Sequence, residues 1–102
     1  MINIYITKKE NASLLNAKVG DSIQLPFEKY LCGVVASEIG NAPMEACKAQ
    51  AIASRTNAYP YYKSGKPISD SSDTSQSFSA KHMISTQYPN AHAAVTQTEG
   101  WI

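Results

Sequence analysis

The chain has 102 residues and a formal net charge of +1, with nine basic against eight acidic side chains. This length is that of a single domain with a moderate hydrophobic core. The balanced charge argues against a nucleic-acid-binding protein, which needs a strongly basic face. No apolar stretch is long enough to span a membrane, and the N-terminus lacks the pattern of a signal peptide.

The N-terminal region predicts two short strands. Isoleucines alternate with more polar residues over 1–7, which is typical of a half-buried strand. Residues 8–13 are polar and predict a link that contains a turn. After a second turn at 19–22, residues 22–25 predict another short strand.

Two helices joined by a short turn follow. Pro26 suits the first turn of a helix, where its missing N–H needs no partner. Gly33 in the middle of this helix predicts close packing against a neighbour, because glycine is otherwise unfavourable there. Gly40 ends the first helix, and the second spans about 43–59 before Pro60 interrupts it. The connector is so short that the two helices should lie antiparallel.

The second half of the chain is less regular. Residues 68–80 are rich in serine and aspartate and predict an irregular segment. A turn is expected at 88–90, before a last helix over 91–98. The elements together predict one α+β domain over residues 1–102. Its centre is an antiparallel helical hairpin that packs with short N-terminal strands and the irregular segment.

Glu38 lies where the helical spacing predicts an apolar side chain. It follows Val34 by four residues and Val35 by three, and so falls near the middle of the apolar face. Lys48 and Arg55 lie on one face of the second helix, about 10 Å apart. Buried cations need anionic partners, and the hairpin should bring Lys48 close to Glu38. We therefore expect a buried site made of these three charged residues.

Two interpretations of Glu38 stay open on spacing alone. A carboxylic acid that keeps its proton near neutral pH is suited to general-acid catalysis, and burial would favour that form. A glutamate near the end of a helix is more often a solvated or salt-bridged surface residue.

Several segments carry a recognisable motif: Leu25-Pro26-Phe27-Glu28-Lys29-Tyr30-Leu31, Val34-Val35-Ala36-Ser37-Glu38, Glu45-Ala46-Cys47-Lys48-Ala49-Gln50-Ala51, Ser54-Arg55-Thr56 and Ala94-Val95-Thr96-Gln97-Thr98-Glu99-Gly100. They resemble the central motifs of the SpoIID/LytB family, the stage II sporulation protein D domain. Ser54 stands where the family usually has alanine. The resemblance covers roughly the first half of a family domain, which implies a domain truncated at its C-terminus.

This resemblance implies a lytic transglycosylase that cleaves peptidoglycan glycan strands, favours strands stripped of their stem peptides and leaves 1,6-anhydro-N-acetylmuramic acid ends. The family's catalytic acid and base falls on Glu38. Its lysine and arginine for activity or substrate binding fall on Lys48 and Arg55. Gln76, in the counterpart of a family Gln-x-Tyr segment, would bind an N-acetyl group or tie down its own loop. Tyr59, in a tyrosine cluster with Tyr61 and Tyr62, would stack on a sugar or cover the end of the core.

Family members act in the extracytoplasmic cell envelope, so the resemblance implies glycan strands and a cell-wall amidase as partners, and an exposed strand would allow a homo-oligomer. The competing interpretation is a non-catalytic wall-binding or amidase-enhancing module. Cys32, Cys47, His82 and His92 lack the short spacings of a zinc site, so we expect neither a metal nor a cofactor.

Overall fold

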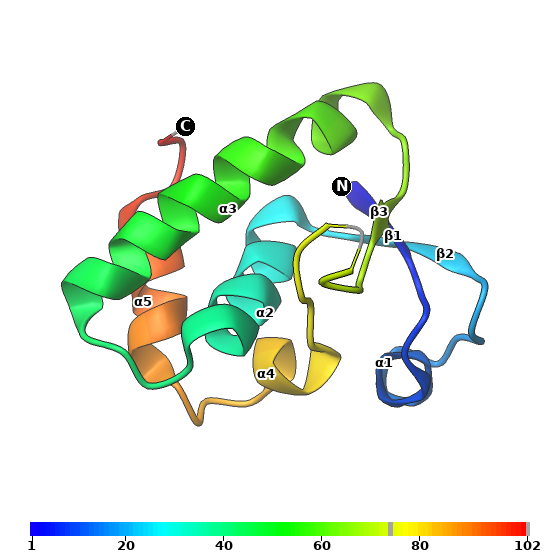
Figure 1. Ribbon diagram of the computed structural model, residues 1–102, viewed down its shortest axis with the longest axis horizontal. Helices are drawn as coiled ribbons and strands as arrows, with labels where there is room; N and C mark the ends of the chain where they lie inside the picture. The colour runs from blue at the N-terminus through cyan, green and yellow to red at the C-terminus, as the bar shows by residue number, and fades with distance from the viewer. Residues whose placement is uncertain (74, 102) are drawn as a thin grey trace.

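The computed structural model describes residues 1–73 and 75–101, and it confirms the α+β fold predicted from the sequence (Figure 1). In chain order the elements are β1 (Ile2–Tyr5), α1 (Lys9–Leu14), β2 (Ser22–Leu25), α2 (Phe27–Ile39), α3 (Met44–Ser64), β3 (Ile68–Ser69), α4 (Ala80–Ile84) and α5 (Pro89–Gln97). The helices gather around α2, and the strands lie to one side of them (Figure 1).

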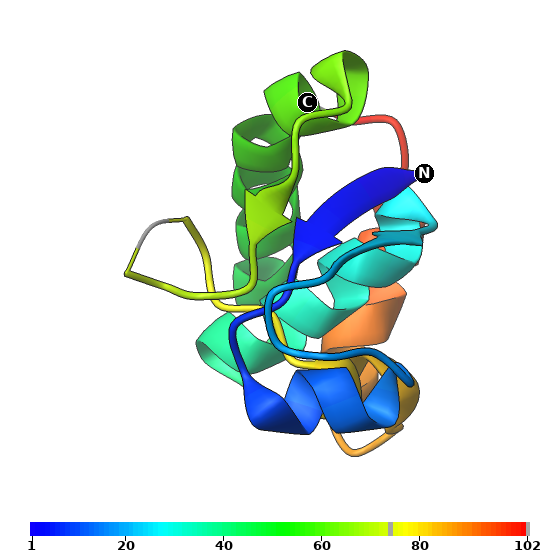
Figure 2. The same ribbon diagram turned by 90° about the vertical axis from the view of Figure 1, so that its right-hand side faces the viewer.

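The strands form one small sheet in the order β2-β1-β3. β1 pairs antiparallel with β2 and parallel with β3, with Ile4 opposite Ile68. The isoleucines of the N-terminal segment turn inward and are buried, whereas Tyr5 is exposed on the outer face. In the view of Figure 2 the sheet lies in front of α2 and α3. The alternation seen in the sequence therefore marks the face of the sheet that covers the helices.

α2 and α3 form the predicted antiparallel hairpin. The start of α2 lies against the end of α3, where the rings of Phe27 and Tyr62 stack with centroids 4.5 Å apart. Gly33 has the close neighbour that its position predicted, because a Cβ at this residue would lie only 2.6 Å from Cε1 of Phe78. α5 packs against both helices of the hairpin and completes a three-helix layer. The core thus lies among these three helices and beneath the sheet.

Three local predictions are wrong. Residues 8–13 were expected to be a link, but Lys9–Leu14 form the short helix α1, which is too brief to show a helical period. α3 continues through Pro60 and ends at Gly65, which adopts a φ of 79°. The tyrosines just after Pro60 hold this last turn, since Tyr61 packs on the core and Tyr62 on Phe27. α5 begins at Pro89, inside the expected turn, because proline suits the first position of a helix.

The Ser/Asp-rich segment is mostly irregular, as predicted, although Thr74 lies outside the described residues and Ile68–Ser69 form β3. Hydrogen bonds to Asp70 connect this segment to the N-terminal region. Its buried carboxylate accepts hydrogen bonds from the backbone N–H and hydroxyl of Thr7, from Lys8 N at 3.2 Å and from Asn11 Nδ2 at 3.0 Å. Burial raises the pKa of Asp70, but these hydrogen bonds outweigh it and hold the pKa below its ordinary value.

Candidate functional site

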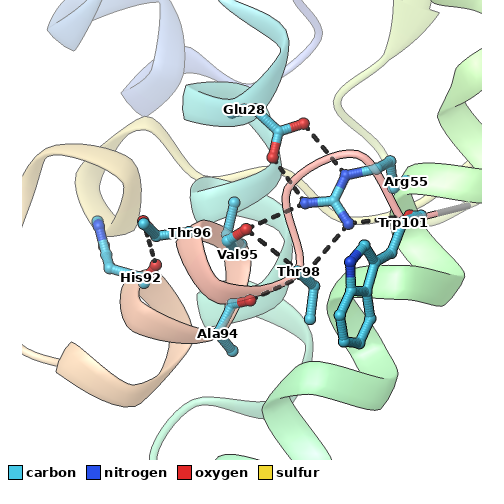
Figure 3. A network of polar contacts seen from close by, with 8 residues as sticks. All are labelled: Glu28, Arg55, His92, Ala94, Val95, Thr96, Thr98 and Trp101. Atoms are coloured by element: carbon cyan, nitrogen blue, oxygen red, sulfur yellow. Dashed lines mark hydrogen bonds and ion pairs between the residues drawn. The ribbon is translucent and has the colours of Figure 1, made fainter.

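Arg55 is a buried charge of the hairpin, and Figure 3 shows its surroundings. The residue is 1% exposed, and its guanidinium makes a bidentate contact with Glu28, at 3.1 Å from Nε and 2.6 Å from Nη2. Nη2 also donates to the Val95 carbonyl, and Nη1 donates to the Thr98 hydroxyl and the Trp101 carbonyl, at 3.1–3.2 Å. All five N–H groups of the guanidinium are therefore used within the protein.

This geometry corrects the predicted place of Arg55. It pairs with Glu28 in the first turn of α2, whereas Glu38 lies in the last turn of the same helix. No N–H of Arg55 remains for a substrate carboxylate, so the residue joins α2, α3 and the segment after α5. A sequence signal for this pair exists, because Glu28 and Arg55 lie at equal separation from the middle of the connector, Asn41–Ala42.

Glu38 lies on the predicted face of α2 but is not buried there. Leu31 and Val34, which precede it by seven and four residues on that face, are fully buried, whereas Glu38 is exposed. The expectation of a buried acid is therefore wrong: the apolar stripe stops before the last turn of the helix. The carboxylate is instead open to a ligand from solvent.

Lys48 lies near the start of α3, just after the connector, and so at the same end of the hairpin as Glu38. Its side chain is 30% exposed, and Nζ lies 3.8 Å from Glu45 Oε1 on the same helix. The ion pairs within residues 1–73 and 75–101 do not include the expected one with Glu38. Glu38 is exposed and Lys48 makes only a surface contact with Glu45, so both charges are accessible to an external ligand.

Gln76 is buried, and its amide Nε2 donates to Tyr30 Oη at 3.1 Å and to the Ser54 carbonyl at 3.3 Å. Both amide hydrogens thus tie the irregular segment to α2 and α3, which favours the second of its two predicted roles. Burial raises the pKa of Tyr30 to about 12, and Gln76 counters this in part. The Glu38 charge also contributes to the rise, so Glu38 lies within electrostatic range of the phenol.

Ser37, the neighbour of Glu38, anchors the irregular segment at the last turn of α2. Its Oγ lies 2.8 Å from Ser77 Oγ, which also accepts a hydrogen bond from Lys8 Nζ at 3.1 Å. A line of polar side chains therefore runs along α2, α3 and this segment, and we call it the polar seam: Tyr30, Ser37, Gln50, Ser54, Gln76 and Ser77. Of its members, the sequence singled out only Gln76 as a site residue and Ser54 as a departure from the family motif, because hydroxyl and amide residues have no spacing that distinguishes them.

Tyr59 lies at the other end of the hairpin from Glu38. It is half-buried, with its ring centroid 6.1 Å from that of Tyr62. Tyr62 in turn stacks on Phe27. The structure therefore does not bring Tyr59 to Glu38, and its packing favours the predicted role of covering the end of the core.

Cys32 and Cys47 are free thiols, and burial raises the pKa of each. Among residues 1–73 and 75–101, no three His, Cys, Asp or Glu side chains are placed to hold a metal ion. Within the same ranges, no helix combines the length and the apolar character needed to cross a membrane.

A family model described as SpoIID, Stage II sporulation protein, matches residues 16–102. The matched region holds the whole hairpin, the irregular segment, α4 and α5, whereas β1 and α1 precede it. Comparisons with curated proteins and with solved structures gave no match. The resemblance inferred from the motifs is thereby confirmed.

Proposed function

Because the chain belongs to the SpoIID family of sporulation proteins, we propose that it is a lytic transglycosylase of peptidoglycan with Glu38 as general acid and base. The observation that carries this proposal is the placement of Glu38. It ends the family motif in the last turn of α2, is open to solvent, and shares its end of the hairpin with the partly exposed Lys48.

One carboxyl group is sufficient for this reaction. Ordinary glycosidases use two, one as acid and one as base or nucleophile. Here the Glu38 carboxyl protonates the glycosidic oxygen as its bond to C1 breaks. The C6 hydroxyl oxygen of the same sugar then bonds to C1, and its proton returns to the Glu38 carboxylate. The product is a 1,6-anhydro sugar, no water is consumed, and the enzyme regains its starting state.

Lys48 supplies the positive charge for the lactyl carboxylate of N-acetylmuramic acid. Its contact with Glu45 involves an exposed carboxylate at 3.8 Å, and such surface pairs contribute little, so a ligand can replace it. Arg55 and Gln76 support the site indirectly. Arg55 holds the helices together, and Gln76 holds the irregular segment against the hairpin.

The exposure of Glu38 also favours a second candidate. General acids usually work where water is excluded, so an open carboxylate is equally suited to a module that binds glycan without cleaving it. Such a module would assist a cell-wall amidase, alone or as a homo-oligomer. It would use the same Lys48 at this end of the hairpin, but Glu38 would have no part in bond cleavage.

Product analysis distinguishes the two candidates. The whole chain is incubated with glycan strands freed of stem peptides, and the products are identified by mass spectrometry. For the enzyme we expect anhydro ends, and Glu38→Gln should lower their rate of release by about a hundredfold or more. Glu99→Gln, an exposed glutamate beyond α5, is the matched control and should act as wild type. Binding without any anhydro product would favour the module.

A further inference from the structure

Residues 77–80, which lead into α4, run between α1 and α2 (Figure 1). Asn11 of α1 holds this segment from one side. The residue is only 2% exposed, and its side chain donates to the Phe78 carbonyl at 3.0 Å and accepts from Ala80 N at 2.8 Å. Its Nδ2 also donates to Asp70 at 3.0 Å, so both amide hydrogens are used within the protein. The segment therefore has a fixed place relative to α1.

Lys8, directly before α1, adds a positive charge to this contact. Its backbone N–H donates to Asp70 Oδ2 at 3.2 Å, and its Nζ donates to Ser77 Oγ at 3.1 Å and to the Phe78 carbonyl at 3.3 Å. A hydroxyl that accepts from a cation becomes a better donor to its next partner, because successive hydrogen bonds polarise one another. That partner is Ser37 Oγ, 2.8 Å from Ser77 Oγ. Ser77 thus links Lys8 to the last turn of α2.

Two contacts hold the last turn of α2, where Glu38 lies. Ile39 packs partly on the core, and Ser37 bonds to Ser77. Within residues 1–73 and 75–101, the Ser37 bond is the only side-chain hydrogen bond that residues 36–40 make. The ends of helices fray where few contacts hold them. Because Ser37 directly precedes Glu38, loss of its bond to Ser77 would loosen the backbone that carries the Glu38 carboxylate.

We propose that Ser77 and Lys8 are positioning residues for Glu38, an inference that rests on the proposed function. They act through Ser37, which keeps the last helical turn in place. A general acid has to be held within about 0.5 Å of its productive position, and a misplacement of about 1 Å can lower the rate about a hundredfold. Lys8 precedes residue 16, so part of this device lies outside the region that matches the family.

Hydrogen exchange tests the positioning without any cleavage. The Gly40 N–H bonds to the Ala36 carbonyl at 3.0 Å and so reports on the last turn of α2. In Ser77→Ala this amide should exchange about two- to tenfold faster than in wild type, whereas the Leu31 amide in the middle of α2 should be unchanged. Ser77→Thr keeps the hydroxyl and should restore the wild-type rate. Ser72→Ala, an exposed serine of the same irregular segment, is the matched control.

The rate of release of anhydro ends tests the consequence for catalysis. Ser77→Ala should lower kcat about tenfold and leave KM unchanged, because Lys48 binds the glycan from α3, and Ser77→Thr should recover the rate. Ser37→Ala combined with Ser77→Ala should be no slower than either variant alone, since both remove the same bond. Lys8→Gln should also lower kcat, whereas Lys9→Gln, its exposed neighbour, should act as wild type.

Two results would overturn the proposal. The first is wild-type exchange at Gly40 in Ser77→Ala. The second is a Ser77→Ala variant with unchanged kcat, or with a loss that Ser77→Thr does not recover. Neither result affects the role of Glu38. Failure of the proposed function would look different: the wild-type chain would release no anhydro ends, while the exchange at Gly40 would still report whether Ser77 holds the turn.

Discussion

Arg55→Lys separates a structural role from a substrate contact. The substitution keeps the positive charge but replaces a planar fork of five donors by an ammonium with three. In the native protein the guanidinium donates two hydrogen bonds to Glu28, two to carbonyls and one to a hydroxyl. Arg55 is only 1% exposed. We expect the lysine variant to be less stable but to bind glycan normally when folded.

The expected magnitude follows from counting contacts. With three donors in place of five, at least two of the five hydrogen bonds from the charged group are lost. Each hydrogen bond to a charged group is worth about 1–3 kcal/mol, so the free energy of unfolding should fall by at least about 2 kcal/mol. Small domains have only about 5–15 kcal/mol in total, so the loss is readily measured.

Urea unfolding followed by circular dichroism measures this change, with the midpoint expected to fall by roughly 1 M or more. Lys48→Gln is the control, because its contact with Glu45 is on the surface and should be worth about 0.5 kcal/mol or less. An Arg55→Lys protein that unfolds like wild type but fails to bind glycan would refute the structural role and restore Arg55 as a substrate contact.

Two further predictions concern the segment that packs on α2. Gly33→Ala should destabilise the protein by about 1–2 kcal/mol in thermal unfolding, because a Cβ would lie 2.6 Å from Phe78 and 2.9 Å from the Ser79 carbonyl, and this clash exceeds the helix-propensity gain of about 1 kcal/mol. A more stable alanine variant would contradict this packing. The pKa of Asp70 is lowered in the folded state, so its ionised form contributes stability above the unfolded pKa, near 4, and this contribution is lost as the pH falls through the folded value. Unfolding free energies measured from pH 6 to 2 should therefore fall less steeply in Asp70→Asn than in wild type, and identical slopes would refute the assignment.

The spacing of apolar residues and the positions of proline and glycine were sufficient to predict the main elements. The alternation in residues 1–7 predicted β1, and proline and glycine marked both ends of the connector of the hairpin. Very short elements, and elements that depend on residues far away in the sequence, could not be predicted in this way. α1 has six residues, and β3 exists only because β1 lies beside it, which no local pattern can report.

The candidate site was predicted in part, for a similar reason. Helical spacing gave the face on which Glu38 lies, but it did not tell how far along that face the core extends. It also placed Arg55 and Lys48 on one face without telling which partner stands opposite each. The antiparallel arrangement sets Arg55 against Glu28, and only the packing of α5 reveals that the guanidinium has no donor left.

The oxygen content of the cleavage products tests the central role of Glu38 most directly. Stripped glycan strands are digested in water enriched in heavy oxygen, with the wild-type chain and with Glu38→Gln, and the masses of the new C1 ends are measured by mass spectrometry. We predict anhydro ends without solvent oxygen from the wild type and almost none from the variant. Heavy oxygen at C1, or equal amounts of anhydro product from the two chains, would contradict the mechanism.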